Sequence, residues 1–107
     1  MNNKFMRIMV FFDLPMETSR DRKEYTIFHK FLIKSGFIMM QKSVYSKLVI
    51  NNVTSQAVKN KIYENVPPSG MVALLEVPEN QFSRIDYLVG EGQSLVEDTM
   101  DRLIEYD

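Results

Sequence analysis

Apolar residues follow one another almost without a break from Met6 to Phe12, and the run stops at an acid, Asp13. A continuous apolar run of this length, rich in strand-forming residues, is typical of a buried central strand. Pro15 cannot extend such a strand, so the strand ends at or near Asp13. Asp13 is therefore expected at the carboxyl end of a buried strand, where sheets often place ligands, although Asp also commonly serves turns.

The pattern changes to a helical period over residues 19–35, with Thr18 or Ser19 as the N-cap and Gly36 just beyond the end. At about 100° per residue, four side chains form the core face: Tyr25, Phe28, Phe31 and Leu32. Four cations fall on a neighbouring arc about 80° wide: Arg20, Lys23, Lys30 and Lys34. Such a stripe indicates either phosphate binding or an ordinary solvated face. The only histidine, His29, lies on this helix and is expected to pack or face solvent rather than to act as a base.

The remaining pattern predicts alternating short elements. Residues 37–50 are rich in strand formers and break near Gln41 and Lys42, so they form either two paired strands or one bent strand. A second helix is expected over 55–65, capped by Thr54 or Ser55, with Val58, Ile62 and Tyr63 facing inward. After the Pro-Pro-Ser-Gly turn, a buried strand is expected over 71–77. A helical turn over 79–83 and a short strand over 84–90 complete the series.

This order predicts an α+β fold of the ferredoxin-like βαββαβ type with an added C-terminal strand. The domain spans residues 1–90. Two helices cover only one face of a four-stranded sheet, so the two-layer domain leaves an apolar sheet face open. An open apolar face implies a partner, most simply a second copy that dimerises through the sheet.

Composition narrows the class of protein. The chain has 107 residues and no cysteine, which excludes disulfides and thiolate metal sites and fits a cytoplasmic location. No apolar run approaches the roughly 20 residues that span a bilayer, so no membrane is expected as a partner. Residues 1–75 carry eleven basic and five acidic residues, whereas residues 76–107 carry two and nine. A basic body with an acidic tail, residues 91–107, suggests a nucleic-acid face and a segment that shields it or docks on a partner.

In order and spacing, the segments MRIMVFFDLP, GFIMMQKSVYSKL and VALLEVPENQFSRIDYLVGE, with the basic helix between the first two, resemble the CRISPR-associated protein two family. This family is the small dimeric subunit of the spacer-acquisition machinery. The form with these motifs is similar to the subunits of type II systems. The likeness extends from Met6 to Glu91 and implies a ferredoxin-like homodimer whose last strand crosses to the partner subunit.

The resemblance also implies site residues. The family's metal-binding acid falls on Asp13, its hydroxyl-bearing motif on Ser43 and Tyr45, and its basic residues on Arg20, Arg22 and Lys23. Many members carry Tyr before the acid, whereas this chain has Phe12, which offers no hydroxyl.

Two functions follow as the main alternatives. The first is an adaptation subunit that holds double-stranded DNA on the basic helices and bridges integrase dimers, and it is the one that we favour from the sequence. The second is an endonuclease for RNA or DNA, in which Asp13 of each copy binds Mg²⁺ at the dimer interface, because one carboxylate per chain holds a hard cation poorly. A regulatory or assembly domain without nucleic acid is the third and plainest alternative.

Overall fold

The computed structural model describes residues 5–90, which form one four-stranded antiparallel sheet and three helices. The strands are β1 (Met6–Asp13), β2 (Ile38–Gln41), β3 (Val44–Val49) and β4 (Met71–Pro78), in the spatial order β2-β3-β1-β4. The helices are α1 (Ser19–Lys34), α2 (Asn52–Tyr63) and the short α3 (Glu79–Phe82). This order of elements and strands confirms the ferredoxin-like fold.

The apolar run that begins the domain is indeed the central strand. β1 pairs in antiparallel fashion with β3 on one side and with β4 on the other. Because alternate residues of a strand face opposite sides, Ile8, Val10 and Phe12 point to the helix layer. The side chains between them, ending with Asp13, point to the opposite face.

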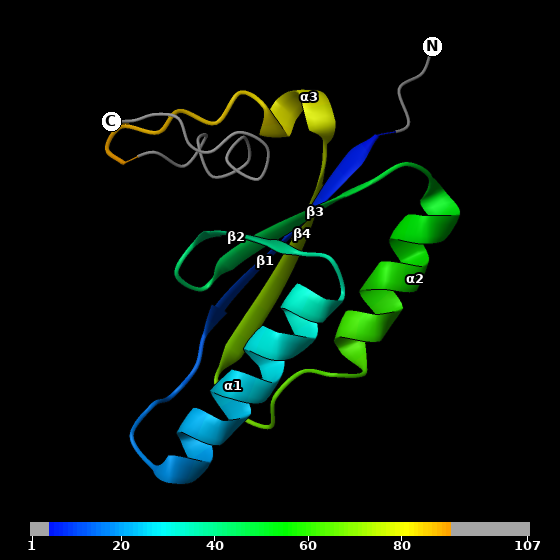
Figure 1. Ribbon diagram of the computed structural model, residues 1–107. Coiled ribbons are helices and arrows are strands. Elements are labelled where there is room, and N and C mark those ends of the chain that lie inside the picture. Colours follow the sequence, from blue (N-terminus) through cyan, green and yellow to red (C-terminus); the bar gives the residue numbers. More distant parts are fainter. Residues whose placement is uncertain (1–4, 91–107) are drawn as a thin grey trace.

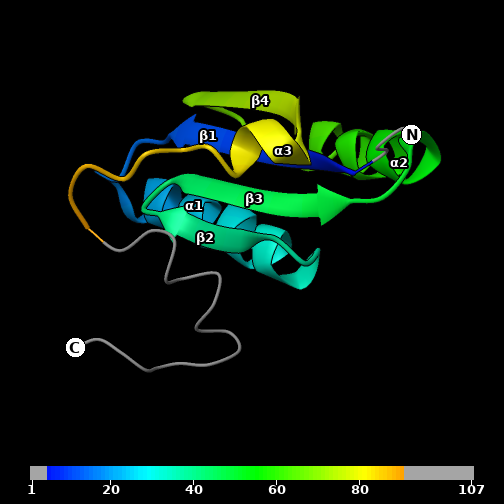
Figure 2. The ribbon, with the colours of Figure 1, turned by 90° about the horizontal axis from the view of Figure 1, so that it is seen from above.

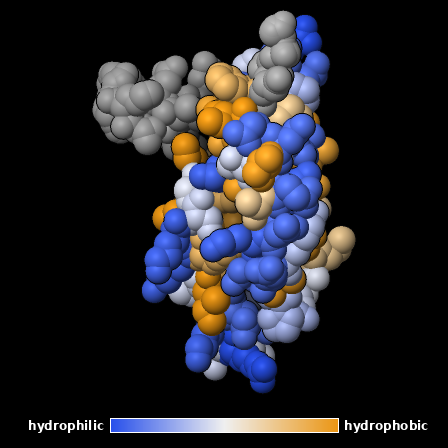
Figure 3. All heavy atoms as spheres, turned by 90° about the vertical axis from the view of Figure 1, so that its right-hand side faces the viewer, coloured by the Kyte–Doolittle hydropathy of each residue, from blue (hydrophilic) through white to orange (hydrophobic). Residues whose placement is uncertain are grey.

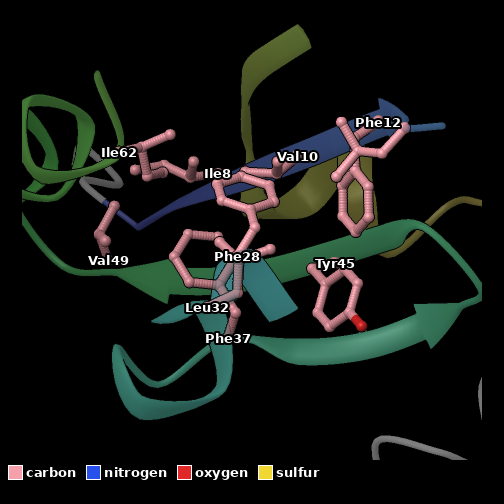
Figure 4. Close-up of a cluster of buried hydrophobic side chains, with 10 residues drawn as sticks. Ile8, Val10, Phe12, Phe28, Leu32, Phe37, Tyr45, Val49 and Ile62 are labelled. Carbon is pink, nitrogen blue, oxygen red and sulfur yellow. The ribbon is translucent and has the colours of Figure 1, made fainter. Parts of the chain in front are cut away.

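The core lies between the sheet and the helices α1 and α2, which run side by side in Figure 1. Phe28 and Leu32 of α1 and Ile62 of α2 are buried against Ile8 and Val10 (Figure 4). Burying aliphatic and aromatic side chains of this size stabilises the fold by about 1.5–3 kcal/mol each. The core face that the sequence predicts for α1 is therefore confirmed, with Phe28 and Leu32 at its centre and Tyr25 and Phe31 partly buried at its margins.

The two ends of α1 match the predicted signals. The Thr18 hydroxyl accepts a hydrogen bond from the Asp21 amide at 2.9 Å, and the Asp21 carboxylate accepts one from the Thr18 amide at 3.1 Å, which makes a capping box. Gly36 follows the last turn with a φ of 94°, a left-handed conformation that glycine adopts without steric cost.

The opposite face of the sheet is only partly covered. In the view from above, α1 lies behind the strands and α3 lies in front of them (Figure 2). Arg7 anchors α3 there: its guanidinium donates two hydrogen bonds to the Glu79 carboxylate, at 2.8 and 2.6 Å, and stacks 4.2 Å from the centre of the Phe82 ring. Beyond α3 this face is apolar and half exposed, with Leu75 and Met71 exposed by 50% and 72%.

Residues 37–50 form two paired strands rather than one bent strand. β2 and β3 make a hairpin with an irregular register between Met39 and Gln41, as the predicted bulge requires. Ser43 turns the chain with a φ of 68°, a left-handed value uncommon for a residue other than glycine.

Three predicted details are wrong. The second helix begins three residues earlier than expected, because the Asn51 side chain, rather than Thr54 or Ser55, caps it by accepting the Thr54 amide at 2.7 Å. Tyr63 is exposed rather than inward. Residues 84–90 form no strand: they pair with neither edge of the sheet, and Leu88 and Val89 are about nine-tenths exposed. The predicted tail, residues 91–107, lies outside the described residues.

Candidate metal and nucleic-acid site

Asp13 is the last residue of β1 and lies on the face of the sheet opposite the helices. It pairs with Met71 of β4, and its side chain is exposed at the margin of the apolar face. No side-chain hydrogen bond or ion pair holds this carboxylate within residues 5–90. Asp13 therefore has free oxygen ligands, which are the ligands that Mg²⁺ prefers.

The backbone around Asp13 is closely packed on two sides. The Phe12 amide donates a hydrogen bond to the Ser43 carbonyl at 3.1 Å, which brings the β2–β3 turn beside the end of β1. On the other side, a Cβ atom placed on Gly70 would lie 2.7 Å from the Asp13 carbonyl oxygen. The end of β1 is thus fixed between two turns, so the Asp13 side chain projects from a rigid position.

The described part of one copy does not by itself form a cluster of metal ligands around Asp13. Within residues 5–90 there is no group of three or more His, Cys, Asp or Glu residues that could hold a metal ion. Magnesium in proteins usually takes one or two carboxylates, with waters and phosphate oxygens as its other ligands. Asp13 fits the ion by its chemistry and its exposure, although residues 5–90 gather no cluster of three ligand residues around it.

Tyr45 lies in the core, away from the open face. Its side chain is fully buried between α1 and the sheet and stacks on Phe12 with ring centres 5.5 Å apart (Figure 4). Its hydroxyl makes a 2.6 Å hydrogen bond with Nδ1 of His29. Burial raises the pKa of the Tyr45 phenol, with a smaller contribution from Tyr25. The structure gives Tyr45 and His29 a packing role that joins α1 to β3, as expected for His29.

Ser43 and Tyr45 are therefore placed differently. Ser43 is half buried in the turn beside β1, so it lies near the end of the strand that carries Asp13. Tyr45 faces the helices, because Val10, its partner in the β1–β3 register, does so too. The structure brings Ser43, but not the Tyr45 hydroxyl, toward the Asp13 end of β1.

The basic residues lie on α1, on the other side of the sheet from Asp13. All four members of the predicted stripe are exposed, and none forms an ion pair within the part of the chain that the structure describes: Arg20, Lys23, Lys30 and Lys34. Arg22 has a structural contact, since its guanidinium donates to the carbonyls of Met16 and Glu17 at 3.1 and 3.0 Å and so holds the loop after β1.

Gly70 is the site residue that the sequence did not single out. The Pro-Pro-Ser-Gly segment signals a turn, but a turn signal does not reveal that this glycine lies against the backbone of Asp13. Its φ of 89° also favours glycine. No local pattern could have shown the contact, because residues 13 and 70 meet only through the register between β1 and β4.

Comparison with known proteins decides the family. The family model described as "CRISPR associated protein Cas2" matches residues 6–85. This chain belongs to the Cas2 family. Proteins named "CRISPR-associated endoribonuclease Cas2" from Treponema denticola and Streptococcus mutans are 46% and 44% identical to it over 92% of this chain, and the matches cover 98% and 91% of their own lengths. The same name belongs to a protein from Ligilactobacillus salivarius that is 39% identical over 92% of this chain and 98% of its own.

A solved structure supports the fold. "Crystal structure of cas2" superposes with a TM-score of 0.57 at 18% identity, and the match covers 82% of this chain and 90% of that one. At that identity the likeness concerns the fold alone. The names of the relatives favour the nuclease alternative over the integrase-bridging function that the sequence led us to prefer. None of the described helices is long and apolar enough to cross a membrane.

Proposed function

We propose that this Cas2 family member is a metal-dependent endoribonuclease whose active centre forms where two copies meet. The observation that carries the proposal is the position of Asp13, exposed at the margin of an apolar sheet face that the helices leave open. The names of the relatives support cleavage of RNA as the reaction.

The open face supports the dimer. Leu75, Met71 and the other half-exposed apolar side chains of this face are a surface that soluble monomers rarely leave bare. A two-fold axis through the face would place the same surface of each copy against the other. Asp13 of both copies would then border one interface, which would bring two carboxylates to the same cation.

The residues of the chain have separate tasks in this proposal. Asp13 of each copy holds the cation, Gly70 and the Ser43 carbonyl fix the strand end that carries it, and the cations at the start of α1 attract the phosphates of the RNA. A divalent cation bound there would polarise the phosphodiester and lower the pKa of a bound water. The Ser43 hydroxyl is the remaining predicted participant beside the strand end.

The experiment is cleavage of a labelled single-stranded RNA and of a DNA of the same sequence, with Mg²⁺ and with EDTA, by the native chain and by Asp13→Asn. Asp13→Asn keeps the size and polarity of the side chain and removes its charge. Cleavage of RNA that needs Mg²⁺ and falls at least about 100-fold in the variant, as the removal of an electrostatic ligand can cause, supports the proposal. Equal cleavage by both proteins would overturn it.

A second candidate function rests on the basic stripe. Four exposed cations without ion pairs among the described residues, repeated on two copies, would form a band that holds duplex DNA by its phosphates while the protein bridges integrase subunits. An integration assay with the co-encoded integrase separates the two functions. Spacer integration that survives Asp13→Ala assigns acquisition to the scaffold, whereas integration that falls together with cleavage assigns it to the Asp13 chemistry.

A further inference from the structure

Between α1 and α2, on the side away from the open face, lies a groove of about 400 Å³. A volume of this size falls within the range of pockets that bind small molecules. Its apolar wall is formed by Phe31 and Phe37 together with side chains of α2: Ala57, Val58 and Ile62. On the side of the molecule that carries α2, apolar areas lie among hydrophilic ones (Figure 3). The groove therefore has the size and the apolar lining to receive an aromatic ring system.

Phe31 gives the groove an aromatic face. Its ring lies nearly parallel to that of Phe28, at an interplanar angle of 23° and with ring centres 6.1 Å apart, so the core supports it on one side. The Phe31 side chain is only partly buried, and it lines the groove. Aromatic side chains in such positions stack on nucleobases of any sequence, because every base has a π-face.

Three lysines from three elements surround this aromatic face. Lys34 at the end of α1 and Lys61 near the end of α2 border the groove. Lys47 of β3 reaches the same end of α1: a Cβ atom placed on Gly36, next to the lining residue Ser35, would lie 2.5 Å from the Lys47 ammonium nitrogen. None of the three lysines forms an ion pair within residues 5–90. Their charge calls for an anionic ligand, and lysine commonly binds phosphate.

An aromatic face beside clustered ammonium groups matches the two parts of a nucleotide, the base and the phosphate. The Ser35 hydroxyl at the edge of the groove makes no hydrogen bond within the described chain, so it can donate one to either part. An acidic peptide would match the charge of the lysines, but it would leave the Phe31 ring without a stacking partner. The groove therefore favours a nucleotide over an acidic peptide.

The basic stripe leads to this groove. α1 begins at Ser19, six residues after Asp13, and ends at Lys34 on the margin of the groove. A helix of 16 residues is about 24 Å long. The other three cations lie along it on the same arc as Lys34. A strand whose phosphates follow the stripe can therefore place one of its nucleotides in the groove.

We propose that the groove between α1 and α2 binds one unpaired nucleotide of a single-stranded nucleic acid, with its base on Phe31 and its phosphate between Lys34 and Lys61. The inference rests on the proposed function for the choice of a nucleic acid, and it gives the strand a second attachment on the helix side of the sheet. The groove needs neither Mg²⁺ nor Asp13, so binding there and cleavage at Asp13 can fail independently.

Fluorescence anisotropy in EDTA tests the groove while metal-dependent cleavage is prevented. The probes are a labelled oligoadenylate RNA of about eight nucleotides, within the usual range of single-strand sites, and the same strand paired with its complement. Lys61 is exposed and lies outside the basic stripe, so Lys61→Gln removes a charge from the groove alone. Phe31→Leu keeps an apolar side chain and removes the aromatic face.

Each of these two variants should weaken binding of the single strand about tenfold. Binding of the duplex should stay within about twofold of native, because paired bases do not enter the groove. The matched control is Lys42→Gln, which removes the charge of an exposed lysine in the β2–β3 turn and should leave both affinities unchanged. Asp13→Asn should bind the single strand as the native chain does, whether or not the native chain cleaves RNA.

The backbone amides of Ser35, Ala57 and Val58 provide a second measurement by NMR. Their resonances should shift when the single strand is added, and AMP alone should need at least about tenfold higher concentration for the same shift, because it makes no contact with the stripe. Native single-strand affinity in both groove variants would overturn the inference, and so would an equal loss of single-strand and duplex affinity.

Two other outcomes would assign the groove to a different occupant. Equal shifts by AMP and by the strand at the same concentration would assign it to a free nucleotide. Shifts caused by a peptide of alternating Glu and Leu, but not by the strand, would assign it to an acidic protein segment. Either result would overturn the inference.

Discussion

Gly70 lies so close to Asp13 that a Cβ atom on residue 70 would come within 2.7 Å of the Asp13 carbonyl oxygen. It would also come within 2.8 Å of the Leu14 side chain. Real Cβ atoms do not approach backbone oxygens this closely, so any larger residue at position 70 must displace the end of β1. The turn before β4 thereby fixes the proposed metal ligand, although 57 residues separate the two positions in the sequence.

The first prediction is that Gly70→Ala lowers both stability and cleavage. The substitution adds the steric conflict with Asp13 to the strain of a left-handed backbone, whose cost alone is about 1–2 kcal/mol. Gly90→Ala is the matched control, because Gly90 has a similar φ of 97° but, among residues 5–90, no heavy atom beyond its chain neighbour lies within 4 Å of the added carbon. Urea unfolding and RNA cleavage should both be affected more by Gly70→Ala. Equal effects of the two variants would show that the closeness to Asp13 is unimportant.

The second prediction separates packing from catalysis at Tyr45. Tyr45→Phe keeps the buried ring and removes the hydrogen bond to His29, which should cost about 0.5–1.5 kcal/mol of unfolding free energy. Because burial raises the pKa of the native phenol, its contribution is complete below the unfolded-state pKa of about 10 and is lost as the pH rises through the folded-state pKa. The variant should therefore lose less stability than the native chain in alkaline solution.

RNA cleavage by Tyr45→Phe, measured at pH 7, is expected to stay within about twofold of native, because the hydroxyl is buried away from Asp13. A loss of cleavage with unchanged stability would instead support the catalytic role that the family resemblance implies.

The third prediction concerns acid stability. Glu76 lies against α2, where it accepts hydrogen bonds from Lys59 at 2.7 Å and from Ser55 at 2.6 Å. The Lys59 ammonium first, and the Ser55 hydroxyl second, lower the pKa of the Glu76 carboxyl. A lowered folded-state pKa gives stability that is present above the unfolded-state value and lost as the pH falls through the folded-state one.

Lys59→Met should therefore reduce the dependence of stability on pH in the acidic range. The measurement is the urea midpoint of the native chain and of the variant between pH 7 and pH 3. The native chain should lose more stability across this range than Lys59→Met. Parallel curves would contradict the assignment of the shift to Lys59.

The fold shows what the sequence could and could not reveal. The apolar run to Asp13 and the Pro15 that follows it define β1, and the Thr18 signal defines the start of α1, because both features are local. Residues 84–90 have the composition of a strand, but a strand also needs an unpaired edge to bind, which composition does not describe. At Asn51 the sequence offered several capping residues within five positions, and only the hydrogen bond from the Thr54 amide decides among them.

In the candidate site, too, the residues with a local sequence signal could be predicted, whereas the contacts between distant segments could not. Asp13 could be found from its place at a strand end, and the basic stripe from helical periodicity. The burial of Tyr45 follows from the register between β1 and β3, which places it opposite Val10, and this register is not visible in a single strand. A groove of about 400 Å³ between α1 and α2, bordered by Lys34 and Lys61, arises from the packing of two helices that the β2–β3 hairpin separates in the sequence.

The fourth prediction tests the basic stripe. Replacing Arg20, Lys23, Lys30 and Lys34 by Gln should weaken binding to duplexes of any sequence and reduce the slope of log K against log salt by about 0.9 for each phosphate that the protein no longer neutralises. Replacing the three lysines by Arg keeps the charge and should keep both affinity and slope. Filter binding at salt concentrations from about 50 to 300 mM gives both quantities. A slope that neutralisation leaves unchanged would remove the stripe from the nucleic-acid interface.

The central claim is that Asp13 of two copies holds one divalent cation, and the most direct test counts bound ions. Titration with Mn²⁺, followed by the paramagnetic resonance signal of the free ion, should show one site for every two chains of the native protein and none for Asp13→Asn. Light scattering on the same samples checks that the variant is still a dimer. One site for every chain, or undiminished binding by a dimeric Asp13→Asn, would contradict the account.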